Sequence, residues 1–78
     1  MDRFTTIAAE LIRNKIAELS DQKFLDRIDL ELIFKKAAEM PLKPANDRMS
    51  DDDARELISR GTWITNTAGE LIAAHMDG

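Results

Sequence analysis

Apolar residues recur at helical spacing through the first quarter of the chain. They stand three or four positions apart, and charged or amide side chains fill the positions between them, which is the pattern of an amphipathic helix. The stripe consists of Phe4, Ile7, Ala8, Leu11, Ile12, Ile16 and Leu19. The pattern predicts a helix over residues 5–19, and Thr5 or Thr6 offers a hydroxyl to cap its first turn.

A second and wider apolar surface runs through residues 21–40. Asp21 stands at the start of this segment, and aspartate there is typical of a helix cap. Most of the apolar residues share one stripe, whereas Leu30 and Phe34 lie toward another face. The stripe is Phe24, Leu25, Ile28, Leu32, Ile33, Ala37 and Met40. Two interpretations fit: one long helix whose second face meets another element, or a break near Asp29, because aspartate caps a helix well and is a poor interior residue.

Proline ends this helical segment. Pro41 and Pro44 remove two backbone donors and push their predecessors away from helical angles. A disordered interdomain linker would be longer and richer in glycine or serine. We therefore expect residues 41–47 to form a stiff loop inside one domain.

The clearest local signal in the sequence follows this loop. Ser50 is a strong cap, and Asp53 has the reciprocal position of a capping box. Three consecutive carboxylates face the positive end of the helix dipole there. They belong to Asp51, Asp52 and Asp53. Arg60 and Gly61 are typical of a helix end, so the sequence predicts a helix over residues 51–60.

The last predicted helix spans residues 66–76. Thr67 and Glu70 have capping-box spacing, and Trp63 and Ile64 fall in a short connection before them. No strand-like alternation and no internal repeat occurs in the chain. The sequence therefore predicts an all-α, small single-domain bundle of four short helices, or five if the second one is broken.

Length and composition narrow the classes of function. A chain of 78 residues forms one domain, and a domain this small buries only about 60% of the surface of its unfolded chain. Formation of a homodimer is therefore one open route to extra stability. Charges interrupt the N-terminal segment, and no apolar run reaches membrane length. We expect a cytoplasmic protein with no membrane association.

Negative charge gathers in the last third of the chain. The formal net charge is −4, and from residue 51 onward six acidic residues face only Arg55 and Arg60. This balance disfavours binding to a phosphate backbone, which needs clustered lysine and arginine. It favours a protein partner with a basic surface. The expected partner-binding residues are Asp51, Asp52, Asp53, Glu56 and Trp63, with packing against the core as the competing interpretation for the tryptophan.

Few side chains in this protein are of the types that act in catalysis or bind metal ions. It has no cysteine and no tyrosine, and its single histidine is His75. The three serines, Ser20, Ser50 and Ser59, lie outside any nucleophile-elbow sequence. One histidine without cysteine cannot build a usual zinc site, and the aspartate triplet lacks the glycine and the spacing of a calcium loop. No glycine lies in a phosphate-binding pattern. We therefore expect neither an enzyme nor a bound metal or cofactor.

Two other functions remain open alternatives. Residues 54–72 have the outline of a DNA-binding helix-turn-helix, with Gly61 near the turn. Two observations weigh against this interpretation. The connection looks longer than the usual turn, and the second helix has no lysine or arginine. A modest basic cluster comprises Lys35, Lys36, Lys43 and Arg48. The other alternative is an assembly subunit of a larger complex, for which the two-faced stretch from Phe24 to Phe34 supplies an apolar contact surface.

In size, acidity and absence of cysteine, the chain resembles the small helical accessory and inhibitor proteins that phages and mobile elements encode, anti-CRISPR proteins among them. The resemblance lies in size and composition and involves no motif. It implies an inhibitor that occupies a basic surface of its target, including a surface that normally holds nucleic acid. If a phage encodes the protein, that target lies in the host cell cytosol.

Overall fold

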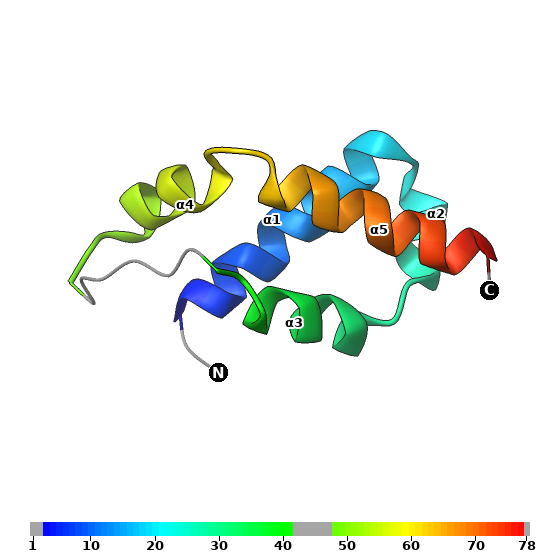
Figure 1. Ribbon diagram of the computed structural model, residues 1–78, viewed down its shortest axis with the longest axis horizontal. Coiled ribbons are helices and arrows are strands. Elements are labelled where there is room, and N and C mark those ends of the chain that lie inside the picture. Colours follow the sequence, from blue (N-terminus) through cyan, green and yellow to red (C-terminus); the bar gives the residue numbers. More distant parts are fainter. Residues whose placement is uncertain (1–2, 42–47, 78) are drawn as a thin grey trace.

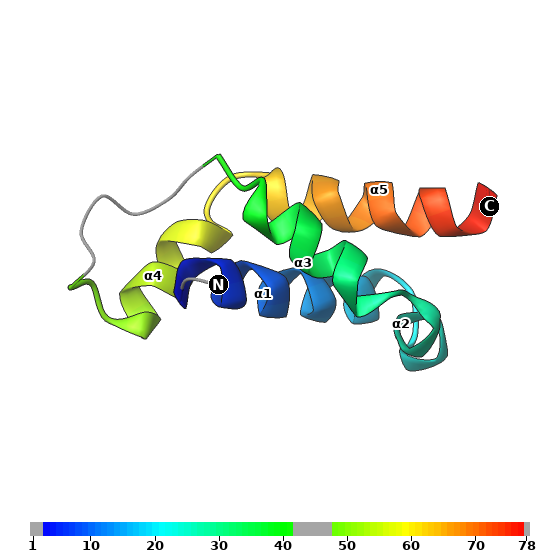
Figure 2. The same cartoon turned by 90° about the horizontal axis from the view of Figure 1, so that it is seen from below.

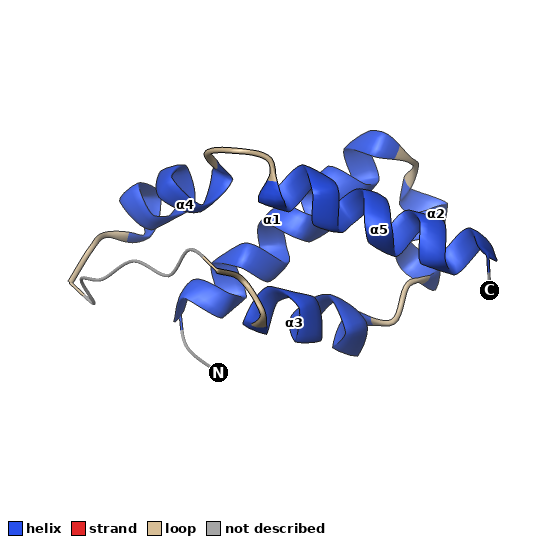
Figure 3. Ribbon diagram, in the orientation of Figure 1, coloured by secondary structure: helices blue, strands red, loops and turns tan. Residues whose placement is uncertain are grey.

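Five α-helices make up the part of the chain that the computed structural model describes, residues 3–41 and 48–77 (Figures 1 and 3). They are α1 (Arg3–Leu19), α2 (Gln22–Arg27), α3 (Leu30–Ala38), α4 (Asp51–Ser59) and α5 (Trp63–Asp77). The described residues contain no strand, so the all-α prediction is confirmed. α1 begins earlier than predicted, and Thr5 and Thr6 lie inside it rather than at its cap.

α1 is the scaffold on which the other helices pack. It contacts α2, α3, α4 and α5, whereas the other helices contact one another much less. α1 and α5 run in the same direction, and α3 runs back the opposite way (Figures 1 and 2). Ala8 and Ala9 of α1 are fully or almost fully buried, and their small side chains let neighbouring helices approach closely. The packing of the whole molecule therefore depends on one helix.

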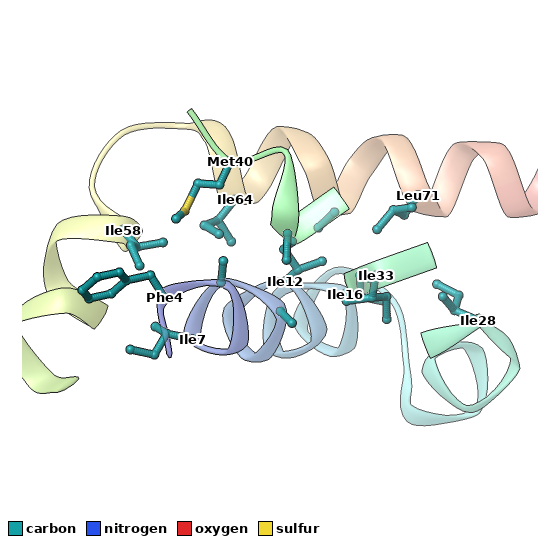
Figure 4. Packing of buried hydrophobic residues seen from close by; sticks show 14 of the residues in the cluster. Phe4, Ile7, Ile12, Ile16, Ile28, Ile33, Met40, Ile58, Ile64 and Leu71 are labelled. Atoms are coloured by element: carbon teal, nitrogen blue, oxygen red, sulfur yellow. The ribbon is translucent and has the colours of Figure 1, made fainter. Parts of the chain in front are cut away.

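The core is a single cluster of apolar side chains contributed by all five helices (Figure 4). Its largest fully buried side chains are Ile12, Ile16, Ile33 and Ile58. The buried positions of α1 follow the apolar stripe seen in the sequence, except that Leu11 is half-buried and Leu19 is exposed. Among the described residues, every buried side-chain nitrogen or oxygen has a hydrogen-bond partner.

The segment predicted over residues 21–40 consists of two helices, α2 and α3. Asp21 caps α2 by accepting a hydrogen bond of 2.8 Å from a first-turn amide. Ile28 then leaves helical geometry, with φ −75° and ψ 136°. Asp29 caps α3 by accepting a hydrogen bond of 2.9 Å from the amide of Glu31. The break at Asp29 lets α3 turn back along α1 while Ile28 stays buried in the core.

α3 ends shortly before the first proline of the predicted loop. Its last residue is Ala38, and the amide of Glu39 donates a 3.1 Å hydrogen bond to the carbonyl of Lys36. Met40 then returns to the core, and Pro41 prevents a further helical turn. Apart from Pro41, the loop predicted over residues 41–47 lies outside the described residues.

The connection between α4 and α5 is shorter than the sequence suggested. Only three residues join the two helices, and Gly61 among them has φ +78°, a left-handed angle that glycine adopts without strain. The predicted start of the last helix near residue 66 is wrong, because α5 begins at Trp63. Ile64 is buried in the core, and Thr67, the predicted cap, is buried inside the helix.

The two ends of the molecule differ in the helices and the exposed apolar side chains that lie there. It measures 39 × 21 × 18 Å. The start of α4 lies at one end of the long axis, and α2 lies at the other with the last turns of α1 and α5 (Figures 1 and 2). All the large apolar side chains that the described residues leave exposed belong to the helix ends on the α2 side: Leu19, Leu30, Leu32 and Met76.

Candidate interaction surface

The three predicted aspartates form the first turn of α4, and we refer to Asp51, Asp52 and Asp53 as the acidic end. Ser50 caps this helix, and its hydroxyl accepts a hydrogen bond of 3.1 Å from the amide of Asp53. All three aspartate side chains are exposed. Successive helical residues point about 100° apart. The three carboxylates therefore fan around the start of α4 instead of forming a stripe along it.

One carboxylate of the acidic end is paired within the chain. Nη1 of Arg3, on α1, lies 3.0 Å from Oδ1 of Asp51. Asp52 and Asp53 form no ion pair with any other described residue. The charge of Asp52 nevertheless interacts with Arg55 and is one of the causes that raise the pKa of that guanidinium, so the negative charge of Asp52 is partly offset within the chain.

A second ion pair joins α1 to α4 one turn farther along α4. The guanidinium of Arg55 contacts both carboxylate oxygens of Glu10, with two nitrogen–oxygen distances of 3.0 Å, the bidentate geometry that arginine favours. The hydrogen bond and the charge of Arg55 hold the pKa of Glu10 below its usual value, and Glu10 raises the pKa of Arg55 by the same two causes. Ala54 and Ile58 are buried beneath, so α4 is fixed on α1 by packing and by both ion pairs.

The other two predicted partner-binding residues are Glu56, one helical turn beyond Asp52 on the same face of α4, and Trp63, the first residue of α5. Glu56 is exposed, and its Oε1 lies 3.2 Å from Nη2 of Arg60, one turn later. Trp63 is half-buried and packs against the core cluster. About 9 Å of helix runs from Asp53 to Ser59, the last residue of α4, and a three-residue connection follows before Trp63. The fold thus brings the aspartates together but leaves Trp63 outside their patch.

His75 lies exposed near the end of α5, with its ring against Phe24 of α2. The ring centroids are 4.9 Å apart and the planes meet at 79°, an edge-to-face contact. No serine among the described residues is paired with His75 in these contacts: each serine hydroxyl forms a hydrogen bond with the backbone at a helix end. The three serines are Ser20, Ser50 and Ser59. Within residues 3–41 and 48–77, no three acidic or histidine side chains are grouped closely enough to hold a metal ion.

The predicted basic cluster falls only partly within the described residues. Nζ of Lys36 lies 3.9 Å from Oε2 of Glu39, a loose ion pair. Lys35 is exposed in the last turn of α3, where a cation interacts favourably with the helix dipole. Arg48 is exposed and interacts within the chain, and Lys43 lies outside the described residues.

The connection between α4 and α5 is short enough for a helix-turn-helix, although the sequence predicted a longer one. Their three-residue connection contains Gly61, as in many such motifs, so the expectation of a long connection is wrong. The charge objection remains, because α5 has no lysine or arginine. The first turns of α5 also bury Ile64, Thr67 and Ala68 against the rest of the molecule.

Sequence reasoning missed a hollow at the α2 end of the molecule. Its volume is about 230 Å³, and it lies between the α2–α3 turn, α3 and the last turns of α5. The lining residues are Arg27, Ile28, Asp29, Leu32, Leu71, Ala74 and His75. The wide apolar surface of residues 21–40 was the available signal. The hollow itself depends on how far α3 and α5 stand apart on α1, which no local pattern determines.

No protein-family model matches this chain, and comparisons with curated proteins and with solved structures also find no match. None of the described helices combines the length and the apolar character needed to cross a membrane. The site therefore has to be interpreted from its own geometry and charge.

Proposed function

We propose that this protein is a small helical protein–protein interaction module whose acidic end docks on a basic surface of another protein. The observation that carries the proposal is the pair of exposed carboxylates on Asp52 and Asp53, which form no ion pair with any other described residue. Unbalanced charge at one place on a surface steers a partner of opposite charge and raises the rate of association.

The acidic end is also held in place before any partner arrives. Ser50 caps the first turn, the ion pairs Arg3–Asp51 and Glu10–Arg55 tie α4 to α1, and Ile58 anchors the same helix in the core. A preorganised surface loses little conformational entropy on binding. The pair with Arg3 takes up Asp51, which leaves Asp52 and Asp53 for the contact.

The position of the carboxylates favours an end-on contact. Figure 1 shows the start of α4 at one end of the long axis. Because the three carboxylates fan around this helix start, a partner would surround it with lysine and arginine side chains. A basic groove that normally holds nucleic acid offers that arrangement. The protein would then act as an inhibitor that occupies the groove, as phage and mobile-element inhibitors do.

Affinity capture from a nuclease-treated lysate of the native host tests this proposal. Three forms of the protein serve as bait: the unaltered chain, Asp52→Asn with Asp53→Asn, and a control with Glu18→Gln and Asp26→Asn. The control also removes two exposed carboxylates, but at the α2 end. Asparagine keeps the size of aspartate, and Asp51 is left unchanged so that its pair with Arg3 survives.

We expect the unaltered chain and the control to retain the same protein, and the Asp52/Asp53 variant to bind it at least about tenfold more weakly. The loss should fall mainly on the association rate, and added salt should reduce the rate for the unaltered chain. Equal binding by the unaltered chain and the Asp52/Asp53 variant would show that the acidic end is not the interface.

A second candidate is the DNA-binding alternative, which the short α4–α5 connection favours. The same capture, run in parallel on a lysate without nuclease treatment, separates the two functions. Recovery of nucleic acid alone, lost on nuclease treatment, would favour the helix-turn-helix reading over the interaction module.

A further inference from the structure

Arg55 is the only lysine or arginine in α4, and it follows the acidic end within about one helical turn. It stands three positions after Asp52 and four after Asp51. At these spacings, side chains of opposite charge on one helix are neighbours and attract each other. Local rules alone therefore predict that Arg55 turns back onto the aspartates of its own helix.

The folded chain pairs this arginine elsewhere. The guanidinium of Arg55 contacts both carboxylate oxygens of Glu10, on α1, at 3.0 Å each. Two parallel hydrogen bonds to one carboxylate are stronger and more directional than a single contact. Ala54 and Ile58 are buried between the helices, so α4 stays docked on α1 and Glu10 stays within reach of the guanidinium.

The choice of partner for Arg55 decides how much negative charge the acidic end presents. Asp51 already has Arg3, at 3.0 Å. Asp52 forms no ion pair with another described residue. Its charge still acts on Arg55, as a weaker cause of the raised pKa of that guanidinium than Glu10. The side chains of the Glu10–Arg55 pair are 52% and 39% exposed, so Arg55 can change partner by rotation of its side chain alone.

We propose that Glu10 is a positioning residue that holds Arg55 away from Asp52, so that a side chain of α1 sets the negative charge which the acidic end offers to a basic partner. The consequence for binding rests on the proposed function. The position of Arg55 and the local charge do not, and both are measurable on the protein alone.

The variant Glu10→Gln tests the position of Arg55. Glutamine keeps the size of glutamate but removes the charge that holds the guanidinium. We expect a crystal structure of this variant to show the guanidinium within about 4 Å of the carboxylate of Asp52, the usual limit for an ion pair. A guanidinium that remains on residue 10 would overturn the proposal.

A small cationic nitroxide and its neutral analogue measure the charge. Each enhances the relaxation of amide protons near it, and the cation gathers where the surface potential is negative. The ratio of the two enhancements at the amides of Asp52 and Asp53 therefore reports the potential of the acidic end. We expect Glu10→Gln to lower this ratio about 1.5-fold, because a cation moves next to Asp52.

The matched control is Glu18→Gln. Glu18 is also an exposed residue of α1, and it also pairs with a cation, Lys15, at 3.1 Å. Its loss changes the net charge by the same amount, but it lies about 12 Å farther along α1 than Glu10. The ratio at the amides of the acidic end should stay nearly unchanged. An equal fall in both variants would show that only the net charge matters.

Removal of the arginine supplies the rescue. The variant with both Glu10→Gln and Arg55→Gln has the same net charge as the unaltered chain, and no guanidinium is left to cover Asp52. Its ratio should return to that of the unaltered chain, and a ratio as low as that of Glu10→Gln alone would contradict the proposal. Amide spectra of every variant confirm that the fold is intact.

The two proposals can fail separately. Capture of a protein that binds the Asp52/Asp53 variant as well as the unaltered chain would refute the acidic end as the interface, but would leave the role of Glu10 in place. If the acidic end is the interface, Glu10→Gln should slow association with the captured protein, and the added Arg55→Gln should restore the rate.

Discussion

Glu10 and Arg55 show how single residues connect distant parts of this chain. They are 45 positions apart in sequence, yet Arg55 contacts both carboxylate oxygens of Glu10. The pairing depends on α4 lying against α1, and only the folded chain brings the two together. The pKa of Glu10 is therefore lower in the folded state than in the unfolded state, and this difference links the pair to stability.

The variant Glu10→Gln tests whether the ion pair with Arg55 makes the stability of the protein depend on pH. At neutral pH the unaltered chain should be more stable than the variant, because its carboxylate is ionised and paired. As pH falls through the folded-state pKa of Glu10, the carboxylate becomes protonated in both states and its contribution disappears. The two proteins should then approach equal stability. Urea unfolding at a series of pH values measures the difference, and a gap that is constant with pH would contradict the prediction.

Residue-scale predictions from the sequence succeeded where the cause is local. Ser50 caps α4 and Gly61 terminates it, because a cap or a left-handed turn needs only its neighbours. Asp29 was ambiguous, since it caps α3 only if the chain turns there, and the turn depends on how Ile28 is buried. Trp63 was expected either in the core or at an interface, and it is half-buried against the core.

At the scale of elements, the two described glycines have opposite roles. Gly61 lies between α4 and α5 with φ +78°, and Gly69 lies inside α5. A Cβ atom at either position would meet no neighbouring atom within 4 Å. The backbone angle therefore decides the effect of a substitution, and the space around the residue does not.

We expect Gly61→Ala to destabilise the protein by about 1 kcal/mol, because alanine is strained at a left-handed angle. Gly69→Ala should stabilise it by about 0.5–1 kcal/mol, because alanine favours the helix interior. Chemical denaturation of both variants beside the unaltered chain gives the two values. Effects of the same sign would show that one of these glycines does not have the backbone geometry described above.

The helices themselves were predictable because apolar stripes repeat along the sequence, but some of their bounds were not. The run of Thr65, Asn66 and Thr67 looks like a helix start, yet α5 begins at Trp63 and buries Thr67. Thr62 stands before the first turn instead, and its carbonyl accepts a hydrogen bond of 2.8 Å from the amide of Asn66. The hollow was beyond prediction, since it depends on the spacing between α3 and α5.

At the scale of the whole molecule, α1 makes the fold cooperative. α2, α3, α4 and α5 each pack on it and contact one another much less. Loss of any one of them exposes part of the buried face of α1. We therefore expect the helices to unfold together in one transition.

Two probes of urea unfolding check this expectation. Far-ultraviolet circular dichroism follows all the helices, and the fluorescence of Trp63, the single tryptophan, follows the packing of α5. The two curves should coincide and give one midpoint. Separate midpoints would mean that part of the bundle, such as α2, which packs mainly on α1, unfolds independently.

The central position of α1 also sets the order of events while the chain is being made. A ribosome releases α1 before the other described helices, but Ile12 and Ile16 are shielded only when those helices pack on them. α5 follows them in the chain and is one of the main covers. The apolar face of α1 therefore stays exposed to chaperones and to other nascent chains until α5 has been synthesised.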